Sequence, residues 1–368
     1  MKILHISGAN GWGGNEQQMI DMIPELTKLG VENIVFGVKD SLLQQECKSK
    51  DISFVDAKGD KLNKFVNYRY LKALVKVTKP DIIHLHTSDS LTVFTISDLL
   101  FRLKIKAVFS KKGMGNSSSI LSKFKYNYSK ISSYFCVSKS VENEFRKILS
   151  KNNISKTVVI HDCVSLQILN SNADYNLRDR FSIAKDNLIV GNIANHTKAK
   201  DLDTFITVAD YIVNVLNKKD IRFVQIGEFS NLTEDFKIKV KESNLEGYLF
   251  FTDRIKNAYA LNTQFDLFLM TSQREGGPTS VLEAMLIGVP VVSTNVGVVS
   301  DVIEDGINGF VSPIKDYKSL AKKIDLLLTD KNLQKKFILD SKSKIEKEFI
   351  VSKIAAQTLK EYIRILQL

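Results

Sequence analysis

The chain has 368 residues, of which 44% are hydrophobic and 25% are charged. This composition is typical of globular proteins and excludes a disordered chain, a collagen-like repeat and a disulfide-stapled miniprotein. At about 150 residues per domain, the length favours two domains. The three cysteines form no CxxC pair and are too few for a disulfide framework, so we expect a reducing, cytoplasmic environment.

Positive charge is concentrated in the first half of the chain. The net charge is +11, and residues 101–150 alone hold 11 basic and 2 acidic residues. Such a patch favours a polyanionic partner: nucleic acid, an anionic membrane surface or a phosphorylated substrate. A basic surface that contacts only solvent is the alternative.

The sequence contains no apolar run long enough to cross a bilayer, which takes about 18 residues. The N-terminal stretch also lacks the apolar middle region of a signal peptide. We therefore expect any membrane contact to be peripheral.

Short β-branched runs alternate with helical stretches, which is the pattern of parallel sheets built from βαβ units. In the first half, strands are predicted at 2–7, 32–38, 52–57, 81–86, 106–110, 134–138 and 157–161. In the second half, they are predicted at 188–193, 221–227, 248–251, 267–272, 289–294 and 310–313. The fold class is therefore α/β, with two doubly wound, Rossmann-like domains.

A polar stretch without a strand pattern, residues 165–187, separates the two halves. A long helical pattern from about 341 to 367 has no strand after it and is free to pack away from its own sheet. The predicted domains are 1–165 with the last helix, about 350–368, and 166–349 between them.

The segment after the predicted strand 267–272 carries the clearest chemical pattern. Glu275, Gly276 and Gly277 form a loop, and Pro278 leads into a predicted helix. The first N–H groups of a helix bind anions, and glycines let a ligand approach the main chain. A diphosphate would fit there, bound by the amides of Thr279, Ser280 and Val281, with Glu283 one turn further on. The alternative is that Gly276, Gly277 and Pro278 only form the turn between a strand and a helix, and that Glu283 is an exposed helix residue.

The whole segment resembles the retaining glycosyltransferases of family 4. The resemblance rests on linked motifs in fixed order over about 40 residues. These motifs are Glu275 and Glu283 at their spacing, Ala284-Met285, Gly288-Val289-Pro290-Val291-Val292, Asn295-Val296-Gly297 and Asp305-Gly306-Ile307-Asn308-Gly309. The resemblance implies a glycosyltransferase-B fold and transfer of a sugar from a nucleotide-diphosphate sugar with retention of configuration.

Further motifs extend the resemblance to the rest of the donor site. Residues 194–206 resemble the family segment whose Lys reaches the leaving diphosphate, and Lys200 falls on that position, while Asn195 stands where many members have Arg. The resemblance implies that Glu275 orients the sugar hydroxyls and Glu283 binds the ribose. Arg254, after the predicted strand 248–251, is expected near the base.

In the first half, Gly13 and Gly14 resemble the family's Gly-Gly loop that closes over the donor diphosphate. Residues 81–86 resemble the family's Asp-Val-Val-His-Ala-His strand, which places His86 on the acceptor side. Lys112 stands near the position of the family's common histidine. We expect no cofactor and no metal, because the acidic pair Asp201 and Asp203 opens a predicted helix.

The expected partners follow from these motifs. They are a UDP- or GDP-linked sugar, a glycan or lipid-linked glycan acceptor of cell-surface polysaccharide synthesis, and an anionic membrane surface bound through residues 101–130 on the inner face of the cell membrane. Nucleic acid is not expected, because no base-reading motif accompanies the charge. Two rivals remain: a nucleotide-sugar epimerase of the same fold, and a non-catalytic accessory homologue.

Overall fold

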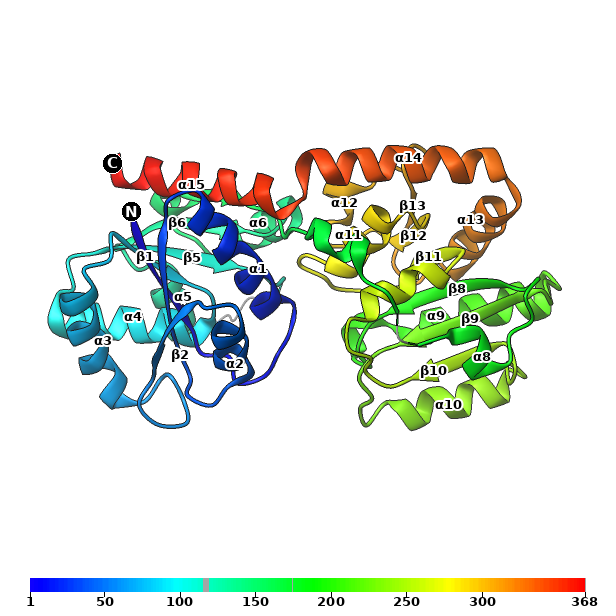
Figure 1. Cartoon of the computed structure of the whole chain (residues 1–368), viewed down its shortest axis with the longest axis horizontal. Coiled ribbons are helices and arrows are strands. Elements are labelled where there is room, and N and C mark those ends of the chain that lie inside the picture. The colour runs from blue at the N-terminus through cyan, green and yellow to red at the C-terminus, as the bar shows by residue number, and fades with distance from the viewer. Residues whose placement is uncertain (115–118, 174, 368) are drawn as a thin grey trace. The chain divides into compact units, whose positions relative to one another are not determined.

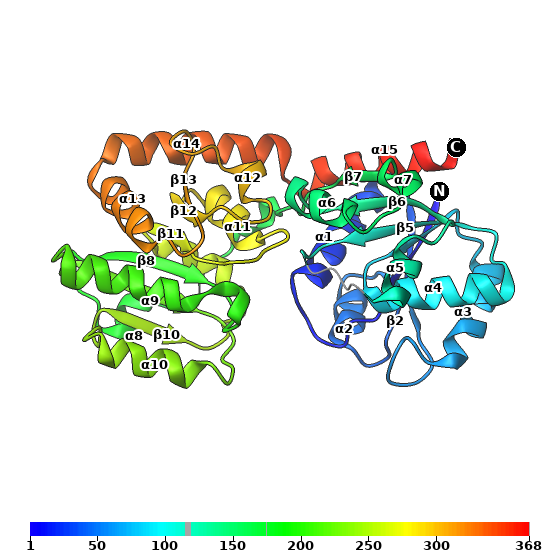
Figure 2. The ribbon, with the colours of Figure 1, turned by 180° about the vertical axis from the view of Figure 1, so that it is seen from behind.

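The structure is a computed structural model that describes residues 1–114, 119–173 and 175–367. Contacts divide it into two compact units, Met1–Cys163 with Val351–Leu368, and Val164–Ile350. Each unit is a parallel sheet with helices on both faces (Figures 1 and 2). Because both faces are covered, the strands are apolar on both sides, as their sequences are.

The sheet of the first unit has seven strands in the order β3-β2-β1-β4-β5-β6-β7. Their bounds are β1 Lys2–Ser7, β2 Glu32–Gly37, β3 Ser53–Asp56, β4 Ile82–Leu85, β5 Lys106–Lys111, β6 Ile131–Cys136 and β7 Thr157–Val159. The order reverses between β1 and β4, so the chain leaves these two strands toward opposite sides.

The helices of the first unit cover both faces of this sheet. They are α1 Gly14–Lys28, α2 Leu42–Ser49, α3 Phe65–Thr78, α4 Ser88–Phe101, α5 Ile120–Tyr126, α6 Lys139–Arg146, α7 Lys151–Ile154 and α15 Val351–Gln367. The last of these returns from the second half of the chain and packs beside α1 (Figure 1). Its buried Tyr362 stacks on Phe135 of β6.

The sheet of the second unit has six strands in the order β10-β9-β8-β11-β12-β13. Their bounds are β8 Leu188–Ile193, β9 Ile221–Ile226, β10 Leu249–Thr252, β11 Leu267–Met270, β12 Val291–Thr294 and β13 Phe310–Ser312. Here the order reverses between β8 and β11.

Helices of the second unit also lie on both faces. The α-helices are α8 Leu177–Phe181, α9 Leu202–Asp210, α10 Thr233–Glu242, α11 Thr279–Ile287, α12 Val299–Val302, α13 Tyr317–Thr329 and α14 Lys331–Glu348. Shorter turns are η1 Leu166–Asn170, η2 Lys198–Lys200, η3 Tyr211–Val215 and η4 Ala258–Gln264.

The α/β prediction is confirmed, since every predicted strand is present and all pair in parallel. One helix prediction is wrong. The pattern from 341 to 367 is not a single helix, because α14 ends at Glu348 and α15 begins at Val351. Between them, Phe349 is buried in the second unit and its carbonyl accepts from the N–H of Val164 at 2.9 Å.

Within the part of the chain that the structure describes, no helix combines the length and the apolar character needed to cross a membrane.

Candidate functional site

The second unit brings Lys200 and Glu275 together where its strand order reverses. Strands β8 and β11 are neighbours, and the loops after them carry Lys200 and Glu275. In open α/β sheets, ligands bind at this point, beyond the carboxyl ends of the strands. The Lys200 Nζ and the Glu275 Oε1 are 2.5 Å apart, and both side chains are largely buried.

Short contacts hold this pair in place. The Ser272 hydroxyl donates to the same Oε1 of Glu275 at 2.7 Å. The N–H of Gln273 donates to the carbonyl of Ala199 at 2.8 Å, and the Thr271 hydroxyl donates to the carbonyl of Asp201 at 3.1 Å. The two loops are thus joined on either side of the ion pair, so its geometry is set by the backbone.

The loop after Glu275 leads into the N-terminus of α11. Gly276 and Gly277 are half-buried, and Pro278 is the N-cap of the helix. The prediction that Val281 offers its N–H to a ligand is wrong. That N–H donates to the carbonyl of Pro278 at 3.1 Å, and the side chain is fully buried. The amides available at this terminus are those of Thr279 and Ser280.

Gly297 packs against this loop from the other side. It has a φ of +58°, and a Cβ added there would lie 2.7 Å from the carbonyl oxygen of Glu275 and 2.8 Å from that of Gly276. Only glycine allows both the left-handed backbone and this close approach. Glu283 is half-buried in α11, eight residues after Glu275.

Asn195 and Arg254 lie on neighbouring loops at the same end of the sheet. The Asn195 Oδ1 accepts from the N–H of Glu228 at 3.1 Å, so this side chain holds the loop after β9. Asp253 accepts from the N–H groups of Phe229 and Arg254 at 3.0 and 2.7 Å. The Arg254 side chain itself is exposed.

His196 is a site residue that the sequence analysis missed. Its ring is buried, with Nε2 2.7 Å from the Gln225 Oε1 and Nδ1 2.8 Å from the Thr233 hydroxyl. The Gln225 amide nitrogen donates to the carbonyl of Ala194 at 2.6 Å, so Oε1 is the acceptor and His196 carries its proton on Nε2. The ring therefore fixes the loop that carries Asn195 and Lys200. The only sequence signal was a histidine between these two residues.

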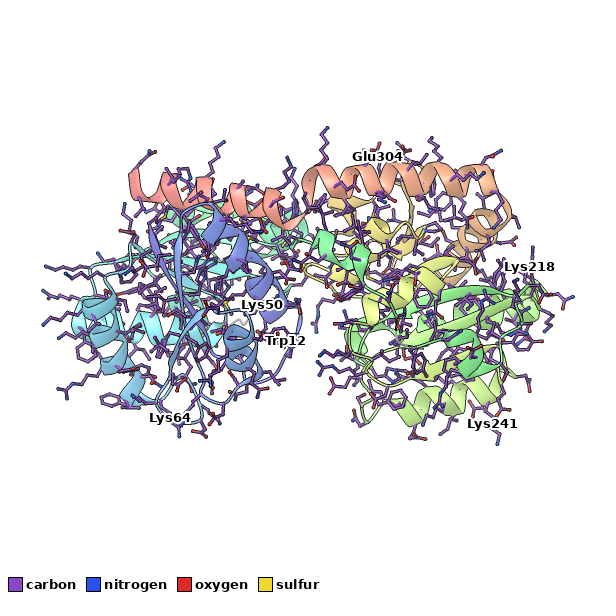
Figure 3. All side chains as sticks on the ribbon, in the orientation of Figure 1. Trp12, Lys50, Lys64, Lys218, Lys241 and Glu304 are labelled. Carbon is purple, nitrogen blue, oxygen red and sulfur yellow. The ribbon has the colours of Figure 1, made fainter. Side chains whose placement is uncertain are left out.

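In the first unit, Gly13 and Gly14 are exposed at the N-terminus of α1 (Trp12, just before them, is labelled in Figure 3). The Glu16 carboxylate turns back to the amides of this terminus. Its burial raises the pKa, and hydrogen bonds from the backbone of Glu16 and Gly13 oppose that rise.

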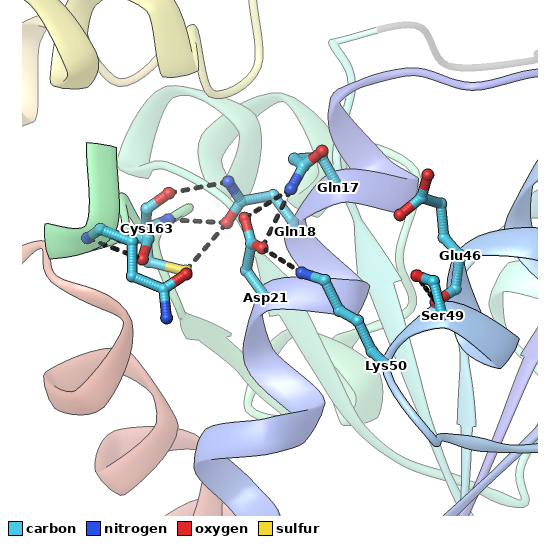
Figure 4. A network of polar contacts seen from close by, with 9 residues as sticks. Gln17, Gln18, Asp21, Glu46, Ser49, Lys50 and Cys163 are labelled. Atoms are coloured by element: carbon cyan, nitrogen blue, oxygen red, sulfur yellow. Dashed lines mark hydrogen bonds and ion pairs between the residues drawn. The ribbon is translucent and has the colours of Figure 1, made fainter. Parts of the chain in front are cut away.

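Helix α1 is also hydrogen-bonded to Cys163, the last residue of the first segment of this unit. The Gln18 side chain donates to the carbonyl of Cys163 at 2.8 Å and accepts from its N–H at 2.7 Å (Figure 4). One turn further on, Asp21 accepts from Gln17 and from Lys50, which follows the last residue of α2 (Figure 4). The two glycines therefore stand at the start of a helix that is tied to Cys163 and Lys50.

His86 and Lys112 line one cavity of the first unit, at the point where its strand order reverses. His86 lies with His5 and His84 in a group of three imidazoles. Burial lowers the pKa of His5 to about 4 and holds the pKa of His84 and His86 well below the usual range, so all three are neutral at pH 7. Lys112 forms an ion pair with Asp162.

Two family models cover most of the chain. The model described as "Glycosyltransferase Family 4" matches residues 12–168, and that described as "Glycosyl transferases group 1" matches residues 175–344. The chain belongs to the glycosyltransferases of the family 4 type. The resemblance seen in the motifs is therefore confirmed.

Curated relatives agree with this membership. The chain is 22% identical to the N-acetyl-alpha-D-glucosaminyl L-malate synthase of Bacillus anthracis, over 75% of this chain and 73% of that protein. It is 23% identical to a Campylobacter jejuni GalNAc-alpha-(1->4)-GalNAc-alpha-(1->3)-diNAcBac-PP-undecaprenol alpha-1,4-N-acetyl-D-galactosaminyltransferase, over 98% of both chains. It spans about half the length of several other curated relatives that it matches.

Among solved structures, Anabaena HepE in complex with UDP has a TM-score of 0.84, with 18% identity, covering 99% of this chain and 100% of that one. This likeness confirms the glycosyltransferase-B fold.

We expect His196→Ala to lower the free energy of unfolding by about 1–3 kcal/mol, because it leaves Gln225 and Thr233 buried without their partner. Burial lowers the pKa of His196, so the folded protein binds the second ring proton, which makes the imidazole positively charged, more weakly than the unfolded chain does. The contribution of neutral His196 to the free energy of unfolding is complete above about pH 6.5, the usual pKa of an unfolded histidine. It is lost as the pH falls toward the lower pKa of His196 in the folded protein.

Urea denaturation at several pH values measures this difference, and hydrogen exchange of residues 194–201 reports on the loop. Thr207→Val, at an exposed threonine whose hydroxyl donates within its own helix, is the matched control. A variant as stable as the wild type at neutral pH, with unchanged exchange, would contradict the positioning role.

Proposed function

We propose that this glycosyltransferase moves a sugar from a nucleotide-diphosphate sugar to a glycan or lipid-linked glycan, with retention of configuration. The observation that carries the proposal is the Lys200–Glu275 pair beside the N-terminus of α11. A cation, a carboxylate and a helix N-terminus at one sheet edge match the two parts of such a donor. The diphosphate takes the positive groups and the sugar hydroxyls take the carboxylate.

Each group then has a defined role. Lys200 and the amides of Thr279 and Ser280 stabilise the negative charge that grows on the leaving diphosphate. Glu275 accepts hydrogen bonds from the sugar hydroxyls, and Glu283 binds the ribose. Gly276 and Gly277 let the diphosphate approach the main chain.

Bond making and breaking occur on one face of the sugar. The bond from the anomeric carbon to the phosphate oxygen breaks, and the acceptor oxygen bonds to the same carbon from the same face. The acceptor's proton passes to the departing phosphate oxygen. No protein nucleophile is needed, so the enzyme's contribution is positioning and charge stabilisation.

The relatives support the substrate classes. HepE has been solved with UDP and with UDP-glucose, which makes a UDP sugar the first donor to test and GDP sugars the second. The Campylobacter relative acts on a lipid-linked glycan by its name, and others are named for O-antigen and capsular polysaccharide synthesis. We therefore place the reaction in cell-surface polysaccharide synthesis.

We predict that Lys200→Ala and Glu275→Ala each reduce transfer by roughly 100- to 1000-fold, the usual effect of removing one preorganised charge contact. Glu283→Ala should mainly raise the KM for the donor, because a ribose contact exists in both ground and transition states. Turnover of UDP- and GDP-linked sugars by the purified protein, with and without glycan acceptors, measures these effects.

Glu234→Ala and Lys237→Ala, which break an exposed Lys–Glu pair on α10 of the same unit, are the matched controls. Near-wild-type turnover in a correctly folded Lys200 or Glu275 variant would overturn the proposed roles. The same assay separates the rivals, since an epimerase isomerises the nucleotide sugar and an accessory homologue only binds it.

We further expect transfer to need no added divalent cation, because lysine and helix amides neutralise the diphosphate. Activity should persist in EDTA. Loss of activity in EDTA that Mg²⁺ or Mn²⁺ restores would contradict this expectation.

We also propose that the first unit binds an anionic membrane surface through α5. Ile120, Leu121 and Phe124 of this helix are 86%, 80% and 53% exposed, and Lys123 of the same helix and Lys130 after it are exposed too. Apolar side chains flanked by lysines are typical of interfacial helices.

Among its described residues, which leave out 115–118, the basic segment 101–130 is not one continuous surface. Lys111 is buried in β5, and Tyr126 and Tyr128 are buried in the core.

We predict that the protein co-sediments with vesicles containing anionic lipid and that salt weakens this binding, since each basic residue near the headgroups contributes about 1 kcal/mol. Leu121→Glu with Phe124→Glu should abolish most of it. The control is Phe65→Glu with Val77→Glu, the same charge change at side chains of α3 that are 77% and 79% exposed. Equal binding of the two double variants would contradict the assignment to α5.

A further inference from the structure

Strand pairing gathers three histidines on one face of the first sheet. His5 of β1 is the register partner of His84 of β4, and His86 follows two residues later on the same face. One ring nitrogen from each can be chosen so that the three atoms lie within 4.8 Å of one another. The rings of His84 and His86 are stacked with centroids 4.1 Å apart.

The hydrogen bonds around His5 fix which of its nitrogens carries the proton. The Asn33 amide nitrogen donates to the Thr27 hydroxyl and to the Val31 carbonyl, at 3.1 and 2.9 Å. The Asn33 Oδ1 must therefore accept the proton of the His5 Nε2, 3.0 Å away. The lone pair of the His5 Nδ1 then points at the His86 Nε2, at 3.0 Å.

His84 is held on both sides by hydroxyl groups. Its Nδ1 is 2.5 Å from the Tyr362 hydroxyl and its Nε2 is 2.7 Å from the Ser110 hydroxyl. Whichever nitrogen takes a ligand, the other keeps a hydroxyl partner. Histidines that bind metals are oriented in this way, by a hydrogen bond from the second nitrogen.

A cavity of about 40 Å³ lies against the three rings. This volume is enough for a water molecule. Thr358 of α15 also lines the cavity, is 97% buried, and its hydroxyl has no hydrogen-bond partner among the described residues. A buried, unpartnered hydroxyl at the wall calls for a polar occupant.

We propose that His5, His84 and His86 bind one divalent cation of the zinc type, with a water in the cavity as the fourth ligand. Three neutral imidazoles and one water form a common tetrahedral zinc site, and imidazole nitrogen favours Zn²⁺, Ni²⁺ or Cu²⁺ over Mg²⁺. On binding, His86 moves its proton from Nε2 to Nδ1, so the site takes up the ion without losing a proton. Nearby, the charge of Lys112 is offset by Asp162.

The proposed metal site does not rest on the proposed sugar transfer. Its three ligands belong to the first unit, whereas Lys200, Glu275 and α11 belong to the second. A cation that assists a diphosphate needs oxygen ligands, which these three residues do not supply.

The test titrates metal-free full-length protein with Zn²⁺ against a chromophoric chelator, and with Co²⁺ while recording its visible absorption. We expect one equivalent to bind, tetrahedral Co²⁺ bands to form, and Zn²⁺ but not Mg²⁺ to raise the thermal midpoint. His5→Gln and His86→Gln should each weaken binding at least about 100-fold, beyond the 10–100-fold cost of removing an outer partner.

His161→Gln is the matched control, because His161 lines the same cavity outside the group of three. It should bind as the wild type does. Absence of saturable Zn²⁺ binding by the wild type, or wild-type affinity in folded His5→Gln and His86→Gln, would overturn the proposal. The Co²⁺ spectrum of the wild type tests the site even where a variant fails to fold.

Discussion

The side-by-side pairing of β8 and β11 is the constraint on which the second unit's site depends. Parallel strands end at one edge of a sheet, and the chain leaves these two strands toward opposite sides. Lys200 and Glu275 therefore meet although 75 residues separate them in the sequence. Backbone contacts from Ala199 to Gln273, and the close approach of Gly297, hold the pair and the loop before α11 in one arrangement. Such preorganisation is what a reaction driven by charge stabilisation requires.

The same topology occurs in the first unit with different chemistry. Its reversal point, between β1 and β4, places neutral imidazoles and a buried hydroxyl where the second unit places an ion pair. Charged groups suit an anionic donor, and nitrogen lone pairs suit a soft cation. The fold thus supplies two equivalent positions, and the side chains at the strand ends decide what each can bind.

The last helix completes the first unit from the far end of the chain. Tyr362 of α15 contacts His84 and stacks on Phe135, and Thr358 closes the cavity beside the three histidines. The short break at Phe349 and Ile350 separates α15 from α14 and lets each helix pack on its own unit. The polar environment of the histidines therefore depends on residues that are nearly 280 positions away from them.

The sequence by itself determined the α/β class, the strands and the loop of Glu275, Gly276 and Gly277, because hydrophobic periodicity and turn residues are local signals. Tertiary structure decided which side chains meet. The ion pair of Lys200 and the grouping of His5 with His84 depend on strand order and register, which local patterns do not encode. Tertiary structure also decided which side chains are buried. Val281 uses its N–H within its own helix turn, Tyr126 and Tyr128 lie in the core, and His196 is buried between two polar partners, because packing against neighbouring elements fixes the exposure of each side chain.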